Sequence, residues 1–281
     1  GVFLGSILMF ATAFRLSTLL LQKLIRQDGF ALEPKYRSII VSHGPSYVCS
    51  MIHCLINGYR GTVQLVGLYA APADVKLFFP PTPQEMEPFI RGVALSNAFF
   101  FAYLVFDLFH VLQLYPKQGG IDTITSYRSG FEEIEARHFK MGKVVHHLVF
   151  LTCSAINGGF QILPFSFTWL IIGELSTIFL NIRWALIKTG RGNTSFFQLV
   201  QYLFALTFFV TRVAIYVYGV LELSQQRDVL RDIVANDRVP GIFMGMTLFF
   251  TGAGSVINLM WFPKVLAMAV SKRSKKETKA S

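Results

Sequence analysis

Charged residues are scarce in this chain. Asp, Glu, Lys and Arg make up only 15% of its 281 residues, whereas hydrophobic residues make up 53%. A soluble globular domain carries about 25% charged residues. The deficit of charge, together with the 28 phenylalanines, excludes an ordinary water-soluble domain and indicates helices that face lipid.

Cysteine is also scarce, because the chain has only Cys49, Cys54 and Cys153. All three lie in apolar stretches, and none has the sequence spacing of metal ligands. An odd number of cysteines within lipid-embedded segments gives no disulfide framework. The sequence therefore predicts small apolar packing residues at these positions, with no metal site and no cofactor.

Acidic residues are fewer than basic residues, 16 against 26, which gives a net charge of +10. A basic chain of this kind can bind nucleic acid. Here, however, the basic residues are scattered between apolar runs. We therefore expect no nucleic-acid partner and attribute the basic residues to the topology of a membrane protein.

Seven stretches approach the length of about 20 apolar residues that a helix needs to cross a bilayer. They are residues 2–22, 38–58, 91–114, 142–158, 161–186, 198–223 and 241–266. The sequence thus predicts an all-α fold, a polytopic transmembrane helix bundle with about seven spans. A further apolar segment, residues 63–79, is interrupted by Pro72, Asp74 and Lys76, and we expect a re-entrant or interfacial piece there.

The basic residues are distributed unevenly between the two sides of this bundle. The side that carries the C-terminal tail has 18 of the 26 Lys and Arg residues, and the opposite side has 6. The positive-inside rule then predicts that the C-terminus faces the cytosol, or the matrix if the membrane is mitochondrial. The same side should hold residues 122–140, with a short interfacial helix at residues 131–139. We expect the endoplasmic reticulum membrane, with the mitochondrial inner membrane as the alternative.

Polar residues recur at helical spacing within the predicted spans. Steps of three, four and seven residues place side chains on one face of a helix. The residues concerned are Ser42, Ser46, Ser50, His53 and Asn57 in the second stretch, Ser96, Tyr103, Asp107 and His110 in the third, His146 and His147 in the fourth, Glu174, Thr177 and Asn181 in the fifth, and Arg212 in the sixth. Two interpretations stay open, namely hydrogen bonding between helices and a functional site inside the membrane.

The depth of the ionisable residues groups them into two sites. At a rise of about 1.5 Å per residue, Glu174 lies about 18 Å and Arg212 about 21 Å from the cytosolic ends of their spans. We predict that they face each other near the middle of the bilayer, with Thr177 and Asn181 as further partners. Asp107, at about 10 Å, should approach His146, at about 6 Å, or the neighbouring His147, in a second and shallower site.

Six short motifs follow one another between residues 37 and 266. The strongest is the segment GELSTIFLNIRW at residues 173–184. The others are Ser50-x-x-His53, Tyr103-x-x-x-Asp107, His146-His147, Phe208-Phe209-x-x-Arg212 and Asn258-x-x-Trp261-Phe262. In this order they resemble the TLC-domain family of multi-pass membrane proteins, whose pattern Glu-x-Ser-(Thr/Asn)-x-Phe-x-Asn fits the first motif.

The resemblance implies an all-helical bundle around a lipid-accessible cavity and a role with sphingolipids or other membrane lipids. The residues that we assign to lipid binding or to the cavity are His53, Tyr103, Glu174, Asn181 and Arg212. One branch of the family, the ceramide synthases, transfers an acyl group from acyl-CoA to a sphingoid amine and carries spaced Asp residues after a His pair. Residues 148–160 contain no Asp, so the chain resembles the non-ceramide-synthase branch more closely.

Three functional hypotheses follow. The leading one is a multi-pass membrane protein that binds or handles membrane lipids in sphingolipid or phospholipid homeostasis, without a catalytic cycle. The second is an acyl-CoA-dependent N-acyltransferase related to ceramide synthase, with His146 or His147 as general base and Asp107 orienting the imidazole. The third is a structural accessory subunit of a large membrane complex, with other membrane subunits as partners.

Hydropathy, the resemblance and the lysine-rich C-terminus together predict a division of the chain into three parts. Residues 1–36 are predicted to form an N-terminal transmembrane helix followed by a basic loop. Residues 37–268 form the TLC-like domain, and residues 269–281 form a basic, disordered tail.

Overall fold

The computed structural model describes residues 1–26, 34–77, 84, 86–117, 131–236 and 238–270. The regular structure among these residues is helical, and they contain no β-strand. The helices are α1 (Val2–Arg26), α2 (Pro34–Tyr69), α3 (Ala73–Leu77), α4 (Glu87–Lys117), α6 (Phe131–Phe160), α7 (Pro164–Ile171), α8 (Glu174–Lys188), α9 (Ser195–Phe208), the π-helical turn η1 (Phe209–Ala214), α10 (Ile215–Gln225), α11 (Arg227–Ala235) and α12 (Gly241–Val270).

Five helical segments of the described chain are long and apolar enough to cross a membrane. They are α1, α4, the α7–α8 pair, the α9–η1–α10 run and α12, and residues 144–160 of α6 form a shorter apolar helix. The remaining predicted stretch lies within the 36-residue helix α2, where the polar stripe lowers the mean hydropathy. The predicted all-α transmembrane bundle is confirmed, and the chain is an integral membrane protein.

Two predictions about local structure are wrong. Residues 63–77, the described part of the predicted segment 63–79, do not form one separate piece, because α2 continues to Tyr69 and α3 begins at Ala73. Proline lacks an N–H and disfavours helical backbone in the residue before it, so the break falls next to Pro72 and not earlier. Residues 131–139 do not form a separate helix either, since no proline interrupts the continuous helix Phe131–Phe160.

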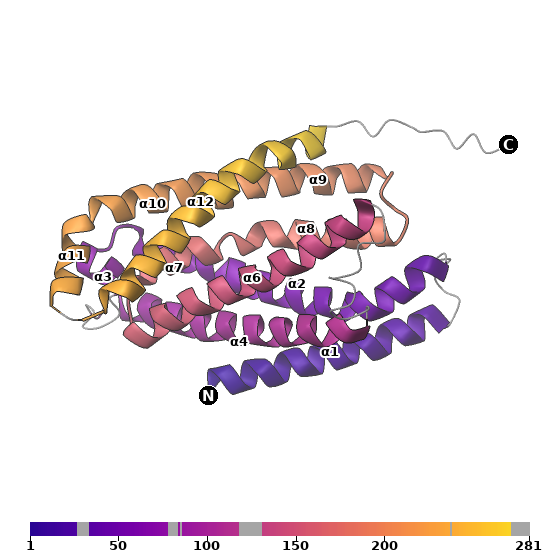
Figure 1. Ribbon diagram of the computed structural model, residues 1–281, viewed down its shortest axis with the longest axis horizontal. Coiled ribbons are helices and arrows are strands. Elements are labelled where there is room, and N and C mark those ends of the chain that lie inside the picture. Colours follow the sequence, from indigo (N-terminus) through magenta and orange to yellow (C-terminus); the bar gives the residue numbers. More distant parts are fainter. Residues whose placement is uncertain (27–33, 78–83, 85, 118–130, 237, 271–281) are drawn as a thin grey trace.

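Helix α2 occupies the interior of one half of the bundle. It packs against α1, α4, α7 and α8, while α6 packs against α4 and α12. Figure 1 shows α1 along one edge of the molecule and α12 crossing the opposite edge over α9 and α10. The polar face of α2 therefore lies among its neighbours, where water cannot reach its polar groups. Side chains of α4 and α8 must supply their hydrogen-bond partners.

Two interruptions of regular helix place ionisable side chains inside this bundle. The fifth predicted span breaks between α7 and α8 at Gly173, where an added Cβ would lie 3.1 Å from the Leu170 carbonyl oxygen and 3.5 Å from Arg212 Cγ. Glu174 thereby enters the first turn of α8, where the helix dipole favours a carboxylate. In the sixth span, the π-helical turn η1 carries Arg212. Turns of this type occur frequently at functional sites.

The turn between α6 and α7 carries two non-glycine residues with left-handed backbone. Gln161 has φ 52° and Leu163 has φ 54°. The side-chain amide of Asn157 donates hydrogen bonds to the carbonyl oxygens of Ile162 and Leu163. These bonds hold the turn in a conformation that both L-residues resist.

We expect Gln161→Gly to raise the free energy of unfolding by about 1 kcal/mol, because glycine adopts positive φ without a steric penalty. The Gln161 side chain is exposed, so its loss should matter little. Gly190, with φ 74°, is the matched control, and Gly190→Ala should lower stability by a similar amount. Unfolding in a detergent titration measures both variants, and a destabilised Gln161→Gly would contradict the assignment of strain to this turn.

Candidate functional site

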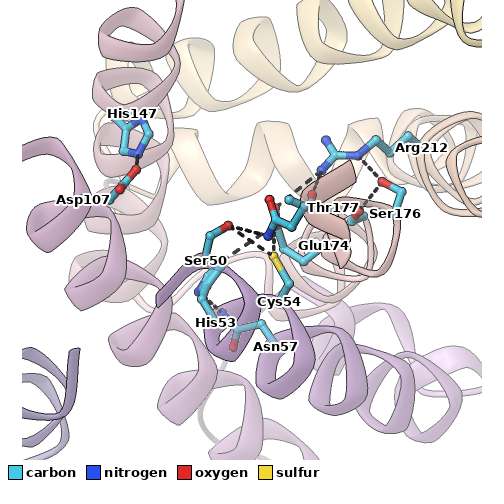
Figure 2. A network of polar contacts seen from close by, with 12 residues as sticks. Ser50, His53, Cys54, Asn57, Asp107, His147, Glu174, Ser176, Thr177 and Arg212 are labelled. Atoms are coloured by element: carbon cyan, nitrogen blue, oxygen red, sulfur yellow. Dashed lines mark hydrogen bonds and ion pairs between the residues drawn. The ribbon is translucent and has the colours of Figure 1, made fainter. Parts of the chain in front are cut away.

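A polar network joins α2, α8 and η1 around the carboxylate of Glu174 (Figure 2). Glu174 Oε1 lies 3.6 Å from Arg212 Nη2. On the other side, Glu174 Oε2 accepts a hydrogen bond from Cys54 Sγ at 3.2 Å and lies 3.8 Å from His53 Nε2. One carboxylate thus connects a cation on η1 with two ligand-type side chains on α2.

Arg212 has further partners on α8. Its Nε donates to Ser176 Oγ at 2.8 Å, and its Nη2 donates to Thr177 Oγ1 at 3.0 Å. The predicted approach of Glu174 and Arg212 is confirmed, and so is the participation of Thr177. Asn181 is not a partner of this pair, because it lies two helical turns beyond Glu174 and donates instead to Ser50 Oγ on α2 at 2.9 Å.

His53 is enclosed between α2 and α4. Its side chain is 1% exposed, and its ring stacks on Tyr103 with 3.8 Å between ring centroids and 12° between ring planes. Its Nδ1 lies 3.3 Å from Asn57 Nδ2, one turn along α2. The helical spacing that grouped His53 with Asn57 in the sequence therefore gives a real contact, and Tyr103 supplies the wall of the site.

Asp107 and His147 form a second buried pair between α4 and α6. The distance from Asp107 Oδ2 to His147 Nε2 is 2.9 Å, and Ser46 Oγ donates to Asp107 Oδ1 at 2.9 Å. The predicted approach of Asp107 to the histidine pair is confirmed for His147. The adjacent His146 side chain is exposed and lies against Phe150, since neighbouring residues of a helix point about 100° apart.

A cavity of about 530 Å³ lies between α1, α2 and α8. Its walls are almost entirely apolar, and Tyr47, Asn181, Thr189 and Arg191 are among the few lining residues with polar side chains. The lining residues include Leu21, Val48, Met51, Asn181, Ala185 and Arg191. Among the predicted cavity residues only Asn181 lines this space. His53, Tyr103, Glu174 and Arg212 do not line this space, because they contact one another across helix interfaces. Their assignment to lipid binding stays a prediction.

No sequence motif marks this cavity. Its lining includes the stacked rings of Tyr47 and Trp184, whose centroids are 3.8 Å apart, and Gly44 of α2, which α1 approaches closely. A Cβ on Gly44 would lie 2.7 Å from Leu21 Cδ1. Both features arise from tertiary packing, so the only sequence signal was the glycine.

Three side chains of the network offer metal-ligand atoms close together. The ligand atoms of His53, Cys54 and Glu174 all lie within 4.8 Å of one another. These residues have no metal-ligand spacing in the sequence, because the carboxylate comes from another helix, 120 residues away from Cys54. Adjacent His and Cys residues alone carry no recognisable metal motif.

The family to which the six motifs point also matches the chain over most of its length. Residues 46–267, most of the chain, match the family model for the TLC domain. No curated protein matches the chain, and no solved structure does. The match spans α2 to α12 and therefore includes both polar clusters and the α2 and α8 walls of the cavity.

Proposed function

The chain belongs to the TLC-domain family of multi-pass membrane proteins, and on this premise we propose that it binds a membrane lipid within its helical bundle and has no catalytic cycle. The lipid is a sphingolipid or phospholipid whose acyl chain occupies the cavity between α1, α2 and α8. The observation that carries the proposal is the chemistry of that cavity. Its apolar lining suits a hydrocarbon chain, and its volume of about 530 Å³ falls within the range of about 300–1,000 Å³ typical of ligand pockets.

The polar atoms of the cavity suit the more polar end of a lipid. Arg191 follows the end of α8 and is exposed, so its guanidinium can meet an anionic headgroup at the membrane surface. Asn181 lies deeper on α8 and is buried. A chain that enters beside Arg191 would pass the apolar side chains Val48 and Met51 before it reached Asn181.

The separation of the cavity from the histidine pair supports a binding role. Asp107 and His147 are 1% and 5% exposed, and neither is among the residues that line the cavity. An acyl group held in the cavity would therefore not touch the imidazole. The missing Asp residues after the histidine pair point in the same direction.

The cavity predicts a specific loss of bound lipid. Ala185→Phe places a phenyl ring into the cavity and should reduce co-purifying lipid at least about tenfold, because a filled pocket leaves no room for a ligand of similar volume. Native mass spectrometry of the purified protein measures the bound lipid. Ala155→Phe is the matched control, since Ala155 is an exposed residue of α6 away from the cavity. Equal lipid loss in both variants, or none in either, would contradict the proposal.

An acyltransferase is the second candidate function. The observation that favours it is the 2.9 Å contact between Asp107 and His147, which is the arrangement that orients a general base. Incubation with acyl-CoA and a sphingoid amine tests it. Acyl transfer by the parent protein that disappears in His147→Ala and persists in His146→Ala would establish the enzyme, and we expect no transfer.

The location and topology belong to the same proposal. We place the chain in the endoplasmic reticulum membrane, or alternatively the mitochondrial inner membrane, with the C-terminus in the cytosol or matrix. Residues 122–130 and the C-terminal tail, which the topology assigns to one side, lie outside the described residues. Cysteine labelling of Ser126→Cys and Ser274→Cys should modify both from the same side. Partner chains retained in native mass spectra would favour an accessory subunit instead.

A further inference from the structure

The imidazole of His53 has an unusual environment. Its side chain is 1% exposed, and Nε2 has no hydrogen-bond partner among the described residues. Burying a polar atom without a partner is unfavourable. Nε2 points to the side where Cys54 and Glu174 present their ligand atoms.

The contact with Asn57 decides what Nε2 can do. Asn57 Nδ2 lies 3.3 Å from His53 Nδ1, while Asn57 Oδ1 has no partner in the described structure. The oxygen and nitrogen of an asparagine amide are assigned from the hydrogen-bond network. Exchanging them places Oδ1 against an Nδ1–H donor and Nδ2 at the former position of Oδ1. This satisfies the amide oxygen and fixes the tautomer with a free lone pair on Nε2. A ligating histidine characteristically has this second hydrogen bond.

The ligand atoms also have suitable separations. Cys54 Sγ is 3.2 Å and His53 Nε2 is 3.8 Å from the same oxygen, Glu174 Oε2. Zinc bonds of about 2.0–2.3 Å in a tetrahedron separate neighbouring ligand atoms by about 3.3–3.8 Å. Both distances are therefore close to those of a tetrahedral site, and all three atoms lie within 4.8 Å of one another.

We propose that His53 Nε2, Cys54 Sγ and Glu174 Oε2 bind one Zn²⁺ ion. A mixed set of imidazole, thiolate and carboxylate favours zinc over the hard cations magnesium and calcium. Cys54 binds as the thiolate, and its proton passes to the solvent when the metal enters. This site is independent of the lipid cavity, because none of its three ligands lines that space.

The surroundings define the remaining coordination position. The thiolate of Cys54 and the carboxylate of Glu174 balance the two charges of Zn²⁺. Arg212 stays 3.6 Å from Glu174 Oε1 and still donates hydrogen bonds to Ser176 and Thr177, so its positive charge has no further anion to balance it. One positive charge is then left over. Three protein ligands leave a fourth position for water, and the leftover charge favours its hydroxide form there.

Metal content of the full-length chain, purified in detergent with any affinity tag removed, tests the proposal. The chain should retain about one zinc per molecule after gel filtration, as measured by elemental mass spectrometry. Replacing zinc by Co²⁺ should produce the near-ultraviolet charge-transfer band of a cobalt–thiolate bond. Cys54→Ser should abolish that band, while Cys49→Ser and Cys153→Ser, which alter the other two buried or half-buried thiols, should retain it.

Variants of Asn57, which contacts His53 Nδ1, keep the test informative if Cys54→Ser fails to fold. Asn57→Leu should weaken zinc binding by about 10–100-fold, the usual effect of losing the partner of a ligating histidine. Asn57→Asp, which still accepts a hydrogen bond from Nδ1, should retain it. Zinc-free parent protein without a cobalt–thiolate band, or metal binding that survives Cys54→Ser, would overturn the proposal and leave a hydrogen-bonded packing cluster.

Discussion

Glu174→Gln should lower the free energy of unfolding by about 3–5 kcal/mol, because it leaves Arg212 in the bundle without an anion. The two side chains are only 18% and 22% exposed. Arg cannot lose its proton and keeps its charge, whereas a carboxylate that loses its partner can take up a proton. Arg212→Met should therefore cost less than Glu174→Gln.

The double variant Glu174→Gln/Arg212→Met should be more stable than the sum of the two single losses predicts. Removal of both charges leaves no unpaired ion in the bundle, so a large part of the single-variant loss should be recovered. Unfolding in a detergent titration, with a chelator present, measures the cycle. Thr177→Val, which removes one neutral hydrogen-bond partner of Arg212, is the control and should cost about 1 kcal/mol. Additive losses would show that the pair does not interact.

The two adjacent histidines should respond very differently to the same substitution. His147→Leu removes the imidazole from the Asp107 carboxylate, which is 1% exposed and accepts a hydrogen bond from Ser46, and should cost about 2–3 kcal/mol. His146→Leu replaces an exposed side chain of α6 that lies against Phe150 and should change stability by less than about 0.5 kcal/mol. The same unfolding measurement compares them. Equal losses would mean that the Asp107–His147 contact does not stabilise the bundle.

Much of the fold follows from the sequence, because hydropathy and helix-breaking residues act locally. Six of the seven apolar stretches fall within continuous helical segments of the structure, and the fifth covers the turn before α7, then α7 and most of α8. The errors concern where a helix begins or ends, as at residues 63–79 and 131–139. Pro72 lies in the gap between α2 and α3, but residues 63–69 still belong to α2. Proline constrains only its own turn and the residue before it, so it did not break the helix as early as residue 63.

Part of the site was also predictable. Equal depth in the bilayer was enough to bring Glu174 and Arg212 together, because ionisable groups in lipid face the interior and seek partners. Depth could not decide between His146 and His147, since this choice depends on the rotation of α6 against α4. It also could not predict that Asn181 turns toward Ser50 on α2.

The cavity and the zinc ligands could not be read from the sequence. Both depend on distances between helices that are remote in the chain, such as the 3.2 Å contact between Cys54 and Glu174. Apolar cavity walls look the same in the sequence as apolar packing surfaces. Only the three-dimensional arrangement of α1, α2 and α8 distinguishes the two.

The central claim is that a lipid chain occupies the cavity between α1, α2 and α8. Photocrosslinking measures this directly, with a diazirine-bearing phospholipid in nanodiscs and peptide mapping of the labelled sites. We predict that the labels concentrate on residues 48–52 of α2 and 182–186 of α8, and that Ala185→Phe removes them while Ala155→Phe does not. Labels spread over outward surfaces such as α12, with no enrichment at the cavity and no response to Ala185→Phe, would contradict the claim.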